Sequence, residues 1–236
     1  LQTGNNDKYL RLWPEVSQAK TFLRQHNQES PLTGRWLLHR KGGDFRRWYG
    51  NQEYVLDWAD DGREIKANPS ARPQNTKLWF KEAVTWSHTS FSFGARYEPA
   101  GSTFNVEGPS YFSDDAVFAT GLMCSAPVLY LMQLMNPTMH FLVGSVSIVP
   151  TPTTNQRTKQ ATRDNSSKAI RLAKTDWNAY ERSWDFQSLP ILTASSEPNP
   201  TLESSYTTWI TQNRETVDEM KRLEEENNRL FIDAYG

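Results

Sequence analysis

The residues most able to do chemistry lie in a basic and aromatic segment between Arg35 and Arg96. Arginine and lysine side chains bind phosphate groups, and arginine also forms paired hydrogen bonds with guanine. The Gly42-Gly43 pair allows the backbone to approach a phosphate closely, because neither residue has a side chain. We expect DNA contacts, to phosphates and to base edges, from ten residues: Arg40, Lys41, Arg46, Arg47, Arg72, Lys77, Lys81, Ser87, His88 and Arg96.

The composition limits this interpretation. The chain has 236 residues, 26 of them basic and 27 acidic, and its net charge of −1 excludes a wholly basic nucleic-acid-binding protein. Acidic residues are interleaved with the basic ones, so an ordinary solvated surface is the alternative. The single cysteine excludes a disulfide scaffold and fits a reducing compartment, which predicts a cytoplasmic protein.

Signatures of catalysis are absent from the sequence. It contains no dinucleotide-binding or P-loop glycine pattern, no H-E-x-x-H motif and no G-x-S-x-G nucleophile motif. Its four histidines are scattered and form no pair with metal-ligand spacing. We therefore predict no catalytic, cofactor-binding or metal-binding residues within this chain.

The elements that must position the basic segment form an α+β pattern. Hydrophobic spacing predicts helices over 7–25, 116–124, 128–135, 166–180 and from 202 onward. Aromatic and β-branched runs predict strands at 54–58, 78–80, 84–86, 91–97, 103–106 and 141–149. The polar tract 151–164 is typical of a linker, and 190–200 of a loop.

Two further stretches bear on the architecture. Residues 116–156 contain no charged side chain. A membrane span is one interpretation of such a stretch. Polar residues interrupt it, however, and favour two buried helices followed by a buried strand, so we predict no membrane contact. From Leu202 to Leu230 apolar residues recur with heptad spacing, which predicts a helix that packs on another helix of this protein. Trp48, Trp58, Trp79 and Trp184 are predicted to lie in the core.

An ordered series of phrases supports a more specific interpretation. The phrases stand at 41–50 (KGGDFRRWYG), 80–87 (FKEAVTWS), 134–138 (LMNPT), 141–144 (FLVG), 183–186 (SWDF) and 230–236 (LFIDAYG). Together they resemble the C-terminal half of the PglX family, the adenine-specific DNA methyltransferases of BREX phage-defence systems. The likeness extends from about Trp13 to the last residue. Fused restriction–modification methylases share part of it and are the alternative within the same class.

The resemblance implies a division of labour. In such enzymes an upstream domain holds S-adenosylmethionine and the Asn-Pro-Pro-Tyr motif that receives the flipped adenine. None of the Asn-Pro pairs in this chain continues in that way. The resemblance thus implies that residues 1–155 form a target-recognition domain with a mostly β core, followed by a helical region over 156–236.

The implied partner is double-stranded DNA, read at a short site for a methyl-transferring domain elsewhere. A protein-interaction module is the alternative of a different class. In that hypothesis the acidic, heptad-patterned end docks other BREX subunits, or a phage DNA-mimic inhibitor occupies the basic face.

Overall fold

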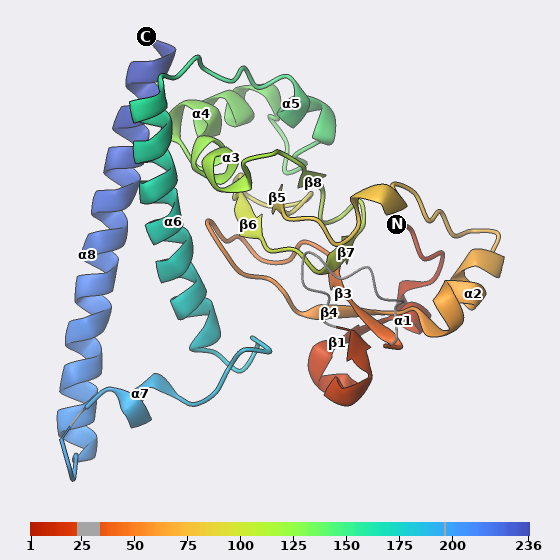
Figure 1. The fold of residues 1–236 in the computed structure, drawn as a ribbon, viewed down its shortest axis with the longest axis horizontal. Helices are drawn as coiled ribbons and strands as arrows, with labels where there is room; N and C mark the ends of the chain where they lie inside the picture. The colour runs from red at the N-terminus through yellow and green to blue at the C-terminus, as the bar shows by residue number, and fades with distance from the viewer. Residues whose placement is uncertain (23–33, 196) are drawn as a thin grey trace.

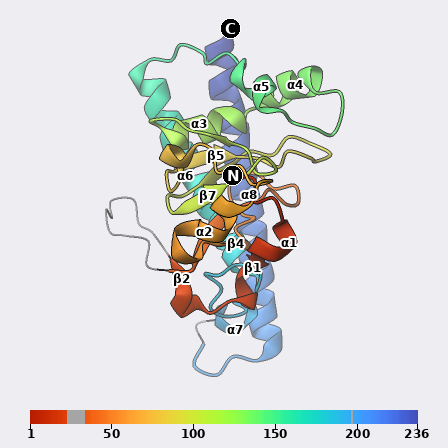
Figure 2. The same ribbon diagram turned by 90° about the vertical axis from the view of Figure 1, so that its right-hand side faces the viewer.

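The computed structural model describes residues 1–22, 34–195 and 197–236 of the chain. It confirms the α+β class: two small β-sheets lie beside a group of helices (Figure 1). The two longest helices run side by side along one edge of the molecule, and the view turned by 90° shows the sheets stacked in front of them (Figure 2).

The first sheet is built around β3. Its strands are β1 (Leu10–Leu12), β2 (Thr21–Phe22), β3 (Trp36–Arg40), β4 (Tyr54–Asp57) and β7 (Ser102–Phe104). On one side β3 pairs antiparallel with β4, which in turn pairs with β1. On the other side the first part of β3 pairs with β2 and the last part with β7, both parallel. The sheet therefore joins segments far apart in the sequence at β3.

The second sheet has three antiparallel strands. They are β5 (Ala83–Thr85), β6 (Arg96–Glu98) and β8 (Ser110–Tyr111), in the order β6-β5-β8. All three residues of β5 are buried. Because β7 of the first sheet lies between β6 and β8 in the sequence, the two sheets are tied together by short connections.

Helices occupy most of the chain after residue 115. The α-helices are α1 (Asn6–Tyr9), α2 (Ala59–Ala67), α3 (Ala116–Met123), α4 (Ala126–Met135), α5 (Val143–Ser147), α6 (Gln156–Asn178), α7 (Pro190–Thr193) and α8 (Leu202–Tyr235). The 3₁₀ turns are η1 (Trp13–Glu15), η2 (Gln18–Lys20) and η3 (Thr76–Leu78). Side-chain caps define where α3 and α6 begin: Asp115 accepts a hydrogen bond from the Phe118 amide, and Asn155 from the Thr158 amide.

The prediction that the last helix packs on another helix of the chain is confirmed, since α8 packs on α6, α4 and α7. Leu223, Asn227 and Phe231 are its most buried side chains. The Asn227 amide donates to the Gly121 carbonyl at 2.9 Å, so a polar position in the heptad pattern serves a hydrogen bond. A Cβ at Gly121 would collide with the Ser166 hydroxyl, so glycine is required where α3 meets α6.

Several predicted elements are wrong. The region 7–22 contains the end of the one-turn helix α1, two short strands and two 3₁₀ turns instead of one long helix, because Leu10–Leu12 pairs with β4 and completes a sheet edge. Residues 23–25 lie outside the described residues. Strand 141–149 is replaced by α5, whose buried Val146 and the flanking Val149 follow helical spacing. The linker 151–164 is mostly the start of α6, because small polar residues such as Thr162 lie buried where helices approach closely.

The remaining differences are local. Predicted strands 54–58, 84–86 and 103–106 are present with shifted ends. Residues 78–80 instead form the end of the 3₁₀ turn η3 and a further turn, and 91–97 is extended only near its end. Residues 190–193 of the predicted loop form α7. Within the described ranges no single helix is long and apolar enough to cross a bilayer; α3 and α4 pass that test only as a pair bent by 65°.

The boundary between residues 155 and 156 stays a prediction. It coincides with the start of α6, but one hydrophobic cluster contains residues from both sides, from Trp48 and Trp86 to Trp177 and Phe231. A second cluster, with Leu37, Leu56 and Trp79, lies under the first sheet.

Candidate nucleic-acid interface

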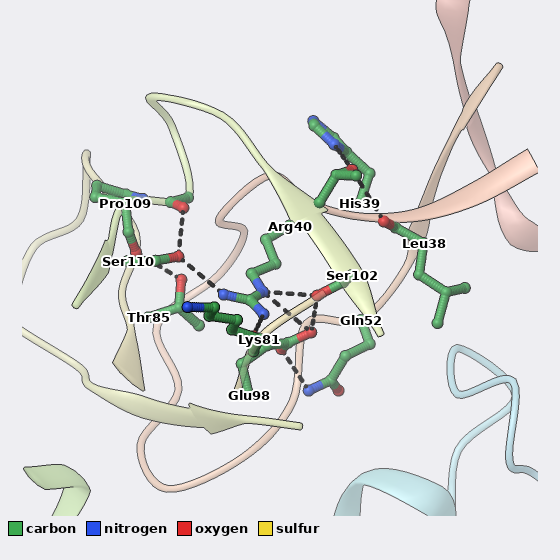
Figure 3. A network of polar contacts seen from close by, with 12 residues as sticks. Leu38, His39, Arg40, Gln52, Lys81, Thr85, Glu98, Ser102, Pro109 and Ser110 are labelled. Atoms are coloured by element: carbon green, nitrogen blue, oxygen red, sulfur yellow. Dashed lines mark hydrogen bonds and ion pairs between the residues drawn. The ribbon is translucent and has the colours of Figure 1, made fainter. Parts of the chain in front are cut away.

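Arg40, the first candidate for DNA contact, lies inside the protein and joins the two sheets (Figure 3). Its Nε donates to Ser102 Oγ at 2.6 Å and lies 3.5 Å from Glu98 Oε1. Its Nη1 donates to Ser110 Oγ at 3.2 Å and its Nη2 to the Lys81 carbonyl at 2.6 Å. The guanidinium is thus engaged on all three nitrogens, and its side chain is 3% exposed.

The acidic partner of Arg40 is equally enclosed. Glu98 accepts hydrogen bonds from Ser102 Oγ at 2.9 Å and from Gln52 Nε2 at 3.0 Å (Figure 3). Burial lowers the pKa of Arg40, and the nearby Glu98 carboxylate opposes that shift. A buried ion pair with satisfied hydrogen bonds holds a fold in place and is costly to break. We therefore remove Arg40 from the candidates for DNA contact.

Arg96 is also a structural residue. It is 1% exposed, and burial lowers its pKa to about 10. Its Nη1 lies 3.4 Å from both Ser87 Oγ and the Gly94 carbonyl. Ser87 itself is buried and donates to the Gly43 carbonyl at 2.7 Å. Neither Arg96 nor Ser87 can reach DNA from this position, so both expectations are corrected.

Arg46 and Arg47 bind the helices. Arg46 lies 3.3 Å from Asp176 of α6, with its guanidinium 4.7 Å from the Trp177 ring centroid. Arg47 donates to the Cys124 carbonyl at 2.6 Å and pairs with Glu224 of α8 at 2.9 Å. Their charges are neutralised within the protein, so these side chains attach the loop before Trp48 to α6 and α8.

The other predicted residues near this loop have intermediate exposure. Lys41 places its Nζ 4.7 Å from the Tyr54 ring centroid. The His88 ring lies 5.2 Å from that of His140. Gly42 has φ +90°, and a Cβ there would meet the Glu107 carbonyl at 2.5 Å. Packing against that carbonyl therefore explains the first glycine without any bound phosphate.

Of the candidate cations, three are both exposed and without a carboxylate partner among the described residues: Arg72, Lys77 and Lys81. Arg72 donates to the carbonyls of Pro69 and Ala71. Lys77 belongs to η3. Lys81 lies two residues before the start of β5, and its carbonyl accepts a hydrogen bond from Arg40. Lys77 and Lys81 form the surface that we call the lysine rim.

The lysine rim borders an open depression of about 700 Å³. Lys77 and Lys81 line it, together with the aromatic residues Trp79, Phe80 and Phe112. The sequence signal for this site was two lysines, Lys77 and Lys81, on either side of the apolar run 78–80. That pattern placed Trp79 in the core, where it is found with 7% exposure, and gave no sign that residues 112–114 would form the opposite wall.

The other tryptophans predicted to be core are Trp48 and Trp58, which are buried, and Trp184, which is half-buried at the surface. In the part of the chain that the structure describes, histidine, cysteine and acidic residues form no group of three that could hold a metal ion. The geometry around the lysine rim thus offers charge and aromatic surface for binding.

Comparison with known proteins tests the resemblance. No family model matches the sequence. Over its full length, however, the chain is 36% identical to the adenine-specific methyltransferase PglX of Lacticaseibacillus casei (strain Zhang). The resemblance to PglX is confirmed. The adenine-specific methyltransferase BrxX of Escherichia coli O9:H4 (strain HS) is 29% identical over 99% of the chain. The chain spans about a fifth of the length of PglX and of BrxX, with 20% and 19% covered.

Proposed function

We propose that this chain is the DNA site-recognition segment of an adenine-specific DNA methyltransferase of a BREX-type phage-defence system. The observation that carries the proposal is the match to two adenine-specific methyltransferases along essentially the whole chain. In this proposal the segment binds duplex DNA and determines the site, while methyl transfer takes place in a part of the enzyme outside this chain.

The lysine rim supports a DNA-binding role. Lys77 and Lys81 have no acidic partner among the described residues, so their charge is available to phosphates. Phosphate contacts position a protein on DNA, and contacts to base edges then select the sequence. Base contacts would come from residues beside this rim.

S-adenosylmethionine is the implied methyl donor, and the residues of this chain do not fit it. The one glycine pair after a strand, Gly42-Gly43, follows β3 but packs against the Glu107 carbonyl and leads into no helix. A nucleotide cofactor needs open backbone amides at such a turn. In this proposal the cofactor and the reacting adenine therefore bind to the remainder of the enzyme.

A segment exchange tests the proposal. Residues 1–236 replace the matching segment of a relative that modifies a different site, and long-read sequencing maps the adenine methylation of the host genome. The proposal predicts that the modified site follows the transferred segment. A chimera that methylates the recipient's original site would contradict it. Exchange of residues 1–155 alone would test whether the predicted recognition domain is sufficient.

The protein-docking alternative stays a proposal with its own test. An acidic DNA-mimic inhibitor would bind the same free cations as DNA, since both present arrays of negative charge. Competition between such an inhibitor and a DNA duplex, measured with and without Lys77 and Lys81, would show whether the two share the rim. Docking of other defence subunits predicts instead a complex that is insensitive to these lysines.

A further inference from the structure

The depression beside the lysine rim has a volume suited to a small ligand. Its volume of about 700 Å³ lies within the range of about 300–1,000 Å³ that is usual for such sites. One wall comes from the segment that begins at η3, and the other from residues 112–114. The depression is open, so part of a larger molecule such as DNA can enter it.

The walls carry aromatic rings held in fixed positions. Trp79 is in edge contact with Trp58 and Phe80, at centroid distances of 5.0 Å and 6.3 Å. Its Nε1 is buried and has no acceptor within the described part of the chain, so one hydrogen-bond donor of a lining residue is unused. Aromatic side chains of this kind stack with unpaired bases, whatever the base.

Phe80 is held in a backbone conformation that a bulky residue rarely adopts, with φ +63°. Its amide donates to the Ser102 carbonyl at 2.9 Å, and its carbonyl accepts from the Gly101 amide at 3.1 Å. The neighbouring Lys81 carbonyl is held by the buried guanidinium of Arg40. Strained positions of this kind are maintained by their surroundings and often occur at binding sites.

The lining of the depression carries both positive and negative side chains. Lys77 and Lys81 are free cations, whereas Glu82 and Asp114 add carboxylates to the lining. Glu82 accepts a hydrogen bond from the Tyr97 hydroxyl at 2.8 Å, and Asp114 is exposed. Phosphates match the lysines, and a carboxylate accepts hydrogen bonds from an exocyclic amino group such as that of adenine or cytosine.

We propose that this depression receives one unstacked base of the bound DNA, a base other than the one that becomes methylated. The base lies against Phe80 and Phe112, its amino group faces Asp114, and its phosphate lies at Lys77 and Lys81. The inference rests on the proposed function, because it requires the segment to bind DNA. Arg40 is a positioning residue for this site, since it holds the backbone at Lys81.

Fluorescence of 2-aminopurine, an adenine analogue that brightens when it leaves the base stack, tests the proposal. The natural protein that contains this chain is bound to duplexes carrying its methylated site, with 2-aminopurine at each position in turn. We expect a rise at the methylated adenine and a second rise elsewhere in the site. Phe80→Asn removes the ring and suits a positive φ; it should abolish the second rise, keep the first, and weaken binding about tenfold.

The control variant is Lys221→Gln. Lys221 is an exposed residue of α8 without an acidic partner among the described residues, so its replacement should preserve both fluorescence signals. If Phe80→Asn fails to fold, photo-cross-linking of the wild-type protein takes its place, with a brominated adenine at the second position. A cross-link mapped to peptides 76–82 or 112–114 supports the site.

The outcomes separate this inference from the proposed function. DNA binding without a second fluorescence rise, a second rise that survives Phe80→Asn, or a cross-link to other peptides would overturn the base site and leave DNA recognition standing. A protein that fails to bind its own methylated site at all would overturn both.

Discussion

The buried arginine network and the lysine rim use cations in opposite ways. Arg40 lies inside the protein with an acceptor for each nitrogen of its guanidinium, whereas Lys77 and Lys81 lie on the surface without acidic partners among the described residues. The planar arginine group suits several fixed acceptors, while a hydrated lysine ammonium stays in water. A basic stretch of sequence can therefore contain both buried cations that stabilise the fold and exposed cations that are available to a ligand.

Replacement of Arg40 is expected to have the largest effect on the free energy of unfolding. Arg40→Met leaves Glu98 buried without its cation and should lower the free energy of unfolding by about 3–5 kcal/mol. Urea denaturation measures this change. The double variant Arg40→Met/Glu98→Met should recover part of the loss, because no unpaired charge is left inside. If Arg40→Met is as stable as the wild type, the network does not hold the two sheets together.

Smaller losses of stability are expected from replacing Arg47 or Arg46, which attach the loop before Trp48 to α8 and α6. Arg47→Ala removes a hydrogen bond to the Cys124 carbonyl and an ion pair with Glu224, and should cost about 1–3 kcal/mol of unfolding free energy. Arg46→Ala is the matched comparison: its partner Asp176 is 56% exposed, so that pair should contribute under about 1 kcal/mol. Equal losses in the two variants would argue against this distinction.

A pH dependence is expected from another buried residue of β3, His39, whose Nδ1 lies 2.8 Å from Thr103 Oγ1. Burial lowers the pKa of His39 to about 3, while an unfolded histidine titrates near 6.5. Because the unfolded chain takes up the proton first, stability is lost as the pH falls below about 6.5, by roughly 1 kcal/mol between pH 6.5 and 5.5. Urea denaturation at both pH values should show a smaller loss for His39→Gln. His140→Gln, at an exposed position, should retain the wild-type loss.

The fold was predictable from sequence where elements depend on local signals. The helices α3 and α4 and the long α8 follow from the spacing of apolar residues, and β4 from a run of aromatic and β-branched residues. The region 7–22 was not predictable, because its strand forms through pairing with β4, which is remote in sequence. The start of α6 was missed because its buried residues are polar and small.

The candidate site was predictable in composition and not in geometry. The sequence shows ten residues able to contact DNA and cannot show which ones have internal acceptors. Arg40 meets Glu98 and Lys81 only through the packing of β3 against β6 and the segment before β5. The second wall of the depression, residues 112–114, comes from another part of the chain and carries no sequence signal of its own.

The most direct test of the account is the salt dependence of DNA binding by Lys77→Gln/Lys81→Gln. The apparent affinity of the natural protein for its duplex is measured at a series of salt concentrations, with Lys221→Gln as the control. If both lysines contact phosphates, the slope of log affinity against log salt becomes shallower by about two, with unchanged stability. A slope equal to that of the wild type would contradict the claim that the lysine rim binds DNA.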